Sequence, residues 1–243
     1  MCALAQHVPA TGAKVAPGID RDALPPGAQA EWISIGGDLV EAGVWWGPLR
    51  EGTATRRATV LAAWHGADWS DPQPPAEESL DDLGGIPDPD VGPVSHWLVE
   101  PDPAVIRAGL VSVLAERTTG HLLDPRIAYI ACDAEPDAGG LGSTFAVLDE
   151  VPFGRKPMRA WLRSRGFGDV IVKKRGVNVI PEELRAALRL AGEGPTATLV
   201  LTRTDAGPLA LLVERTPPGS GPPLQEARTS GGEEPGEQPG PPR

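Results

Sequence analysis

The chain has 243 residues, of which 30 are glycine and 28 are proline. This share is about twice the usual one and excludes a single compact, fully ordered domain. No apolar run reaches the roughly 18 residues that a membrane span needs, and residues 1–8 lack the pattern of a secretion signal. Only Cys2 and Cys132 are cysteines, which excludes a disulfide scaffold and favours free thiols in a reducing cytoplasm.

The net charge of -11 is unevenly distributed along the chain. Residues 1–150 contain 8 basic and 23 acidic side chains, a net charge of -15. Residues 151–216 contain 12 basic and 6 acidic side chains, a net charge of +6. Such asymmetry predicts an anion-binding module attached to an acidic body.

The first part of the chain has a β pattern. Residues 14–16 form a short candidate strand, and residues 57–63 form another. Between them, residues 31–35 and 39–46 alternate in polarity on either side of Gly36-Gly37-Asp38. Two alternating runs around a Gly-Gly turn predict a β-hairpin.

Two segments have compositions that do not favour a packed core. Residues 65–95 are rich in acids and prolines and contain no Lys or Arg, which predicts an acidic linker. Residues 217–243 are about half Gly and Pro and contain almost no side chain able to pack, which predicts a disordered tail.

A helix is predicted after residue 102. Asp102 can accept hydrogen bonds from free amides, and Pro103 suits the first helical position. Apolar residues then recur at helical spacing until Gly120, where we expect the helix to end. Residues 127–132 and 144–151 are the next two candidate strands.

The last folded unit has an α-β-α-β-β pattern. Its predicted helices cover residues 157–165 and 181–190, and its predicted strands cover residues 170–174, 196–202 and 209–213. Ile180 stands where a capping acid or serine would stabilise the second helix.

Basic side chains gather in this last unit. Lys156, Arg159 and Arg163 are spaced to share one helix face, and three more cations close the following strand. The predicted binding residues are Lys156, Arg159, Arg163, Lys173, Lys174 and Arg175. They favour contact with nucleic-acid phosphates. The alternative is a solvated basic face that balances the acidic body in cis.

No catalytic, cofactor-binding or metal site is predicted. The glycine-rich residues 139–144 resemble a phosphate loop, but no Lys precedes Ser143 and a strand follows instead of a helix. The four histidines are scattered through separate segments, and no serine lies in a Gly-x-Ser-x-Gly frame.

The order of several motifs resembles that of one family. Residues 13–19 and 30–42 resemble the closing part of a class I S-adenosylmethionine-dependent methyltransferase domain. Residues 98–110 and 123–129 resemble the small ferredoxin-like domain of the same proteins. Residues 150–153, 172–179, 181–184 and 198–203 resemble their THUMP-like domain.

The resemblance implies an α/β (α+β) fold with several parts. We expect a remnant of a Rossmann-like methyltransferase sheet, then a ferredoxin-like domain and a THUMP-like domain. The expected ranges are 1–64 for the remnant, 65–95 for the linker, 96–150 for the ferredoxin-like domain, 151–216 for the THUMP-like domain and 217–243 for the tail.

The resemblance also implies a function. The family uses S-adenosylmethionine, and its THUMP-like domain implies contact with structured RNA through backbone and shape. The chain has no Asp/Glu-x-Gly-x-Gly turn, so we expect that it holds no methyl donor. It would then position RNA for a methyltransferase. The alternative is a non-catalytic RNA-binding or scaffold subunit that needs a separate methyltransferase half as its partner.

Overall fold

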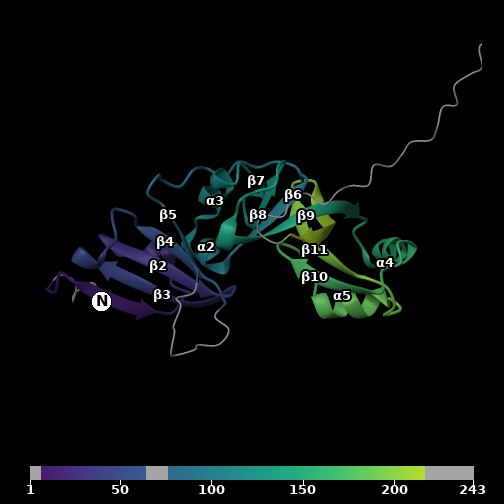
Figure 1. Ribbon diagram of the computed structural model, residues 1–243, viewed down its shortest axis with the longest axis horizontal. Coiled ribbons are helices and arrows are strands. Elements are labelled where there is room, and N and C mark those ends of the chain that lie inside the picture. The colour runs from purple at the N-terminus through teal and green to yellow at the C-terminus, as the bar shows by residue number, and fades with distance from the viewer. Residues whose placement is uncertain (1–6, 64–75, 217–243) are drawn as a thin grey trace, which may run out of the picture.

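The computed structural model describes residues 7–63 and 76–216. The chain is a mixed α/β protein with two sheets and a few short helices, which confirms the expected fold class. It is elongated, with the first sheet at one end and helices α4 and α5 at the other (Figure 1). The predicted tail and residues 65–75 of the predicted linker lie outside the described residues.

The first sheet has five strands in the order β1-β3-β2-β4-β5. Its elements are β1 (Thr11–Val15), η1 (Arg21–Ala23), β2 (Ala28–Ile35), β3 (Asp38–Trp46), η2 (Gly47–Leu49), β4 (Arg56–Leu61) and β5 (Glu77–Asp81). Strands β2 and β4 run parallel, and the other neighbours run antiparallel. The predicted hairpin is confirmed as β2 and β3, with positive φ angles at Gly36 and Gly37.

Strand β5 lies within the range expected to be a linker. Its acidic side chains do not prevent pairing, because β5 is an edge strand beside Arg57 of β4, which lies opposite Asp81. The carboxylate of the next residue, Asp82, accepts hydrogen bonds from the backbone amides of Thr55 and Arg56 at 2.7 and 3.1 Å. Strand pairing and the backbone amides that donate to Asp82 therefore hold an acidic segment on the sheet edge.

The second sheet has seven strands in the order β10-β11-β12-β9-β6-β8-β7. Its strands are β6 (Trp97–Pro101), β7 (His121–Asp124), β8 (Ile127–Cys132), β9 (Gly142–Val151), β10 (Asp169–Lys174), β11 (Thr196–Thr204) and β12 (Gly207–Arg215). The helices are α2 (Pro103–Ala108), α3 (Val111–Arg117), η3 (Gly139–Leu141), α4 (Arg155–Ser164) and α5 (Pro181–Leu188). The pattern predicted for the last unit is confirmed, whereas the single helix predicted from Pro103 to Gly120 is wrong.

The break between α2 and α3 lies at Gly109. This residue has a φ of 75° and ends α2 in the left-handed conformation. The amide of Leu110 donates back to the carbonyl of Val105 at 3.0 Å, which is typical of a helix end closed by glycine. The apolar spacing continues across the break because both helices pack on the same core, so periodicity alone did not reveal it.

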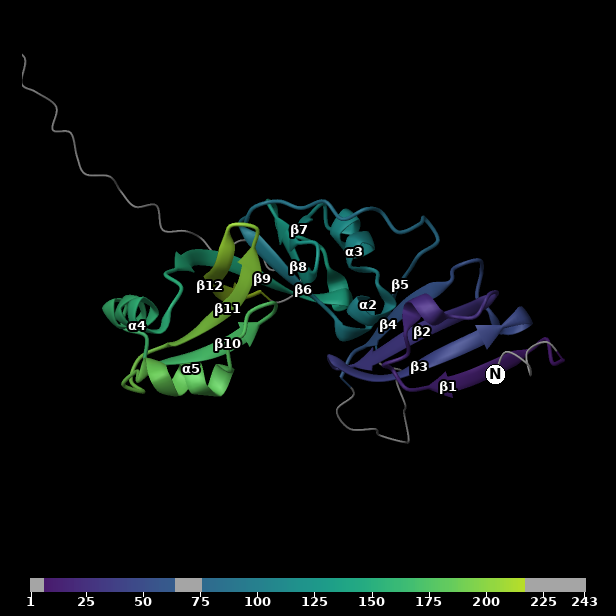
Figure 2. The same cartoon turned by 180° about the vertical axis from the view of Figure 1, so that it is seen from behind.

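The seven-stranded sheet is strongly curled. Lys173 of β10 and Glu100 of β6 lie four strands apart in the sheet order. At about 4.8 Å between neighbours, a flat sheet would separate them by about 19 Å. Lys173 Nζ instead lies 2.7 Å from Glu100 Oε2, and Arg203 of β11 lies 3.5 Å from Asp124 of β7. The β10–β11 edge is thus brought opposite β6 and β7 (Figure 2).

The inner face of the curl has its own apolar core, which we call the concave core. Its buried members are Leu98, Leu123, Ile127, Tyr129, Ala131, Phe145, Val200, Leu211 and Val213. They come from strands on both sides of the curl, so the core fills the space between them. Burial raises the pKa of the Tyr129 hydroxyl, and the nearby Glu100 carboxylate acts in the same direction. Tyr129 therefore stays neutral inside this core.

The other face of this sheet carries the helices at both ends. Helices α4 and α5 pack on β9–β12 through Met158, Leu162, Leu184 and Leu188. Helices α2 and α3 join residues of the first sheet, such as Trp32, to residues of the second in one continuous core. The two sheets are therefore joined by apolar packing (Figure 1).

Asp102 is the polar junction between these parts. The residue is 7% exposed, and its Oδ1 accepts hydrogen bonds from Ser34 Oγ of β2 at 2.6 Å and from the Ala104 amide of α2 at 2.8 Å. Its own amide donates to the carbonyl of Leu141 at 2.8 Å. The predicted capping role of Asp102 is confirmed, and the contact with Ser34 extends it to the first sheet.

Replacing Asp102 with Ala should lower the free energy of unfolding by about 1–3 kcal/mol. The change removes a helix cap and leaves the buried Ser34 hydroxyl without its acceptor. Chemical denaturation followed by circular dichroism measures the loss. Asp102→Asn is the control, because it keeps an acceptor oxygen and should cost less. Equal losses in both variants would contradict the capping explanation.

Asp124 should stabilise the fold in a pH-dependent way. Hydrogen bonds from the Arg126 side chain and backbone, together with the charge of Arg203, lower the pKa of this carboxyl below its ordinary value of 3.8. A lowered pKa adds stability at neutral pH that is lost as the pH falls through the folded-state value. Asp124→Asn should therefore lower the midpoint of thermal unfolding at pH 7, and the difference from wild type should shrink below pH 3.8.

The control for this measurement is Asp88→Asn, which changes an exposed carboxylate outside the curl. It should leave the unfolding midpoint nearly unchanged at both pH values. A difference between Asp124→Asn and wild type that stays constant with pH would show that charge is not the cause.

Candidate nucleic-acid interface

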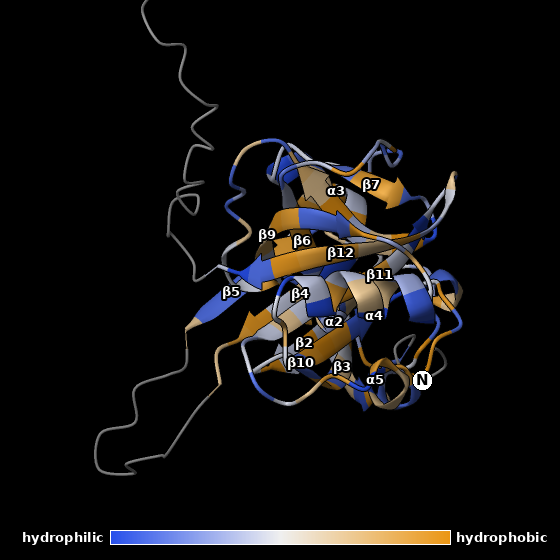
Figure 3. Cartoon of the chain, turned by 90° about the vertical axis from the view of Figure 1, so that its right-hand side faces the viewer, coloured by the Kyte–Doolittle hydropathy of each residue, from blue (hydrophilic) through white to orange (hydrophobic). Residues whose placement is uncertain are grey.

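Helix α4 carries a dense group of cations on its outer side. Met158 and Leu162 face the core and are buried, whereas Arg155, Lys156 and Arg163 are exposed. The helix contains no acidic residue. We call Arg155, Lys156, Arg159 and Arg163 the α4 cationic face. It lies at the end of the molecule that faces the viewer in Figure 3.

Two members of the α4 cationic face are fixed by backbone oxygens. Arg159 donates to the carbonyl of Ala187 at 2.6 Å, and Arg163 donates to the carbonyl of Arg189 at 2.5 Å. Both carbonyls lie at the end of α5, where the helix dipole favours positive charge. Within residues 7–63 and 76–216, Lys156, Arg159 and Arg163 form no ion pair with a carboxylate. The charges of Arg159 and Arg163 are therefore held in place without a paired carboxylate.

An aromatic pair lies at the end of α4. The rings of Trp161 and Phe167 stack with centroids 6.4 Å apart and planes inclined by 8°. The guanidinium of Arg165 lies 3.7 Å from the centroid of the Trp161 ring and also pairs with Asp149 at 3.2 Å. Trp161 is only half-buried and packs at the edge of the core beneath α4.

The three cations at the end of β10 lie apart from α4. Lys173 and Arg175 both reach Glu100, with N–O distances of 2.7 and 3.3 Å. Lys174 is exposed. The start of β10 is tied to α5 by the ion pair of Asp169 and Arg185, so these cations lie at the opposite end of the strand. The structure therefore divides the six predicted residues into two groups.

Lys173 and Arg175 of the second group line a cleft of about 650 Å³ between the two sheets, which we call the intersheet cleft. Its lining from the second sheet includes Glu100, Ser143, Lys173, Arg175 and Arg215, and its lining from the rest of the chain includes Gly36, Gly37, Leu61, Glu78, Asp102, Gly139 and Gly140. A neighbouring cleft of about 530 Å³ shares Gly139, Gly142, Ser143 and Arg215. The sequence pattern did not predict either cleft, because each is built from segments far apart in the chain.

The glycine-rich residues 139–144 form part of the cleft wall. A strand, β9, follows them as expected. The Gly140 amide donates to Glu78 Oε2 at 2.6 Å, and Glu78 also pairs with Arg117 at 2.5 Å. In a phosphate loop this backbone amide would donate to the ligand, whereas here the Gly140 amide already donates to the Glu78 carboxylate of β5.

Other kinds of site find little support in the part of the chain that the structure describes. No group of three or more His, Cys, Asp or Glu side chains is placed to hold a metal ion in these residues. Cys132 is a buried free thiol, and burial raises its pKa; Cys2 lies outside the described residues. No described helix is long and apolar enough to cross a membrane.

A known family model matches the part of the chain that contains β9 to β12 of the second sheet. The sequence model of the THUMP domain-like family matches residues 142–215. Residues 142–215 form a THUMP-like domain. The match begins before the expected boundary at residue 151, because β9 starts at Gly142 and pairs along its length with β12 and β6.

Known relatives extend the comparison beyond the THUMP-like domain. The chain is 36% identical over 200 residues to uncharacterised S-adenosylmethionine-dependent methyltransferases from two strains of Mycobacterium tuberculosis. The match covers 81% of this chain and 51% of each relative, so the chain spans about half the length of these proteins. The chain is a relative of this methyltransferase family, as the resemblance predicted.

A solved structure shows the same fold. A putative methyltransferase from Porphyromonas gingivalis W83 superimposes with a TM-score of 0.63 and 21% sequence identity. The superposition covers 88% of this chain and 54% of that protein. The two proteins therefore share this fold although their sequences are only 21% identical.

The intersheet cleft does not fit the methyl donor. Such a site needs a free carboxylate for the ribose hydroxyls. Asp102 instead accepts from Ser34 and Ala104, and Glu100 is paired with two cations. Glu77, the exposed acid of the lining, accepts from Ser79 Oγ at 3.4 Å. Among the described residues, no aromatic side chain lines this cleft to pack against an adenine ring.

Proposed function

We propose that this chain positions RNA for an S-adenosylmethionine-dependent methyltransferase through its THUMP-like domain. The observation that carries the proposal is the α4 cationic face, where Arg159 and Arg163 are fixed by backbone carbonyls and no described carboxylate pairs with a member of the face. Phosphate contacts need fixed positive charge on an exposed surface, and they do not need base-specific geometry. No described carboxylate forms an ion pair with this face, which favours an interface over the alternative of a face that only balances the acidic body.

The predicted residues contribute differently to this function. Lys156, Arg159 and Arg163 supply the open face, and Lys174 adds an exposed cation at the other end of β10. Lys173 and Arg175 are already paired with Glu100, so they bind a phosphate only after this carboxylate is displaced. The methyl donor would be held by another part of the protein or by a partner, and the protein would act in the cytoplasm.

The second candidate is a non-catalytic scaffold subunit that needs a separate methyltransferase half. Strands β1 and β5 are the edges of the first sheet and offer unpaired backbone groups. Lys14 and Glu41 form an exposed ion pair beside β1, which reduces unwanted strand addition there. A partner that adds to this sheet would favour the scaffold.

Neutralising the α4 cationic face should weaken RNA binding. The double variant Lys156→Gln with Arg163→Gln should bind a fluorescein-labelled RNA hairpin about fivefold to twentyfold more weakly at 50 mM salt. The slope of log affinity against log salt should fall in magnitude by about 1.5, because two phosphate contacts are lost. Fluorescence anisotropy at several salt concentrations measures both effects.

The matched control is Lys14→Gln with Arg107→Gln, which removes one lysine and one arginine from exposed positions elsewhere. This control should bind RNA within about twofold of wild type. Equal weakening by both double variants would indicate non-specific attraction. Binding by wild type that does not change with salt would exclude a phosphate interface.

The purified chain should show no saturable uptake of S-adenosylmethionine. The described lining of the intersheet cleft offers this donor no aromatic wall, and its carboxylates Asp102, Glu100 and Glu77 already accept hydrogen bonds or pair with cations. Equilibrium dialysis with labelled donor at concentrations up to about 1 mM tests this, since enzymes commonly work at micromolar to millimolar substrate levels. Saturable binding in that range would assign a donor site to this chain.

A further inference from the structure

We infer that Lys173 and Arg175 form a phosphate-binding position in the intersheet cleft and that the Glu100 carboxylate occupies it in the free protein. The inference rests on the proposed function, because it names a second RNA contact that the α4 cationic face does not provide. The ligand is a phosphate group, and the favoured source is the RNA backbone.

The geometry around Glu100 is that of an anion held by two cations. Glu100 Oε2 lies 2.7 Å from Lys173 Nζ, and Glu100 Oε1 lies 3.3 Å from an Arg175 nitrogen. Each carboxylate oxygen therefore faces one cation. Carboxylate and phosphate oxygens are recognised by the same paired donors, so a phosphate could take this position.

The cluster has more positive than negative charge. One carboxylate faces two cations, which leaves a surplus of one positive charge. Arg215 adds another cation to the cleft wall, and it donates to Ser143 Oγ at 3.2 Å. Ser143 lies directly opposite Glu100 in the pairing of β6 with β9. A phosphate carries more charge and more acceptor oxygens than the carboxylate that it would replace.

The two cations are held in place independently of Glu100. Lys173 Nζ lies 5.3 Å from the centroid of the Phe145 ring, and the Arg175 guanidinium lies 5.5 Å from that of Tyr129. Both rings belong to the concave core and are fully buried. Because the rings fix the cations, little ordering is needed when the anion is exchanged.

The position is open to a ligand. The side chains of Glu100, Lys173 and Arg175 are 18%, 35% and 29% exposed. Of the other acids in the cleft wall, Asp102 binds Ser34, Glu78 binds Arg117, and Glu77 is exposed at the edge strand β5. The 650 Å³ of the cleft is ample for a phosphate with its attached sugar.

Glu100→Gln should therefore tighten RNA binding. The change keeps the shape of the side chain and removes the charge that competes with phosphate. The probe is a fluorescein-labelled RNA hairpin with a single-stranded 3′ extension, titrated in phosphate-free buffer. At 50 mM salt we expect affinity about threefold to tenfold higher than wild type and a salt slope steeper by about one.

The matched control is Asp149→Asn, which makes the same change in net charge at the exposed partner of Arg165. It should alter RNA affinity less than about twofold. Adding Lys173→Gln and Arg175→Gln to the Glu100→Gln chain should abolish the gain. Equal gains in Glu100→Gln and Asp149→Asn, or a gain that survives removal of both cations, would overturn the inference.

Thermal unfolding shows whether the Glu100→Gln chain is folded. If it is not, a separate variant tests the same inference. Arg215→Gln leaves the Glu100 cluster intact. The Arg215→Gln chain should bind RNA about twofold to fivefold more weakly than the wild-type chain. Unchanged RNA affinity in a folded Arg215→Gln chain would count against a phosphate in the cleft.

Inorganic phosphate distinguishes the source of the ligand. If inorganic phosphate at about 1 mM removes the higher RNA affinity of Glu100→Gln, the position accepts free phosphate. If the higher affinity persists, the RNA backbone is the occupant. Both results support a phosphate position. RNA binding that depends on Lys156 and Arg163 but is unaffected by Glu100→Gln would overturn this inference and leave the proposed function standing. Absence of RNA binding in every variant would overturn both.

Discussion

The curl of the seven-stranded sheet is the constraint on which the rest of the structure depends. Residues four and five strands apart in the sheet order come within ion-pair distance, as Lys173 and Glu100 show at one place and Arg203 and Asp124 at another. Apolar side chains from both sides of the curl fill the space between. The ion pairs at the rim place opposite charges together beside an apolar interior, where an unpaired charge would be costly.

The same curl decides which cations remain available. It brings the end of β10 against Glu100, and so two of the predicted binding residues are paired within the chain. Helix α4 lies on the outer side, where Arg159 and Arg163 donate to backbone carbonyls at the end of α5. Two cations at the end of β10 are consequently paired with a carboxylate, whereas Lys156, Arg159 and Arg163 of α4 form no such pair among the described residues, although the two groups look alike in the sequence.

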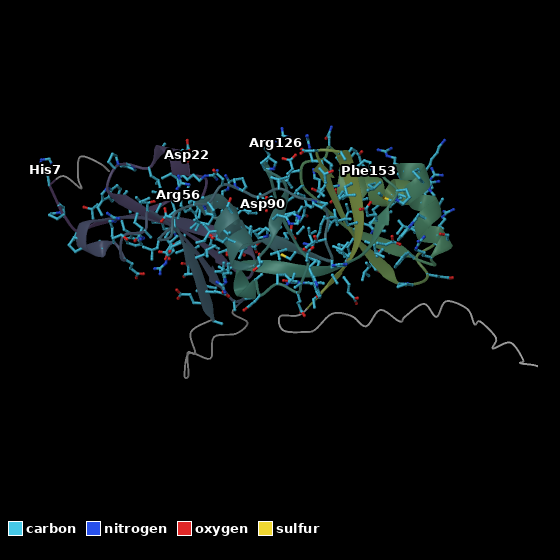
Figure 4. All side chains as sticks on the ribbon, turned by 90° about the horizontal axis from the view of Figure 1, so that it is seen from above. His7, Asp22, Arg56, Asp90, Arg126 and Phe153 are labelled. Atoms are coloured by element: carbon cyan, nitrogen blue, oxygen red, sulfur yellow. The ribbon has the colours of Figure 1, made fainter. Side chains whose placement is uncertain are left out.

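The surface of the molecule shows how widely its ion pairs are spread. Asp22 and Arg56 pair at 3.1 Å at the first sheet, whereas Arg126 pairs with Asp124 at the second sheet (Figure 4). Most of these exposed pairs contribute little to stability. The packing of α2 and α3 between the sheets and the buried Asp102 contact with Ser34 matter more for holding the two halves together.

Local patterns predicted most elements, since alternation identified β2 and β3 and helical spacing identified α4 and α5. The capping role of Asp102 was also readable, because it depends on adjacent residues. The pattern failed where tertiary contacts decide. The acidic β5 is held by pairing with β4 and by backbone amides that bind Asp82, and the break at Gly109 is hidden by a shared core. Only part of the candidate site could be predicted. The spacing of cations revealed the face of α4 but could not show that Glu100 lies against β10.

The pairing of β9 has a consequence for how such domains could be exchanged between proteins during evolution. The family match covers residues 142–215, yet β9 also pairs with β6, and Leu98 and Tyr129 supply part of the concave core. A gene segment limited to the match would leave a strand edge bare and a core half empty. Inheritance of the THUMP-like domain in this architecture is therefore tied to the strands that precede it, and recombination would have to carry β6 to β8 along.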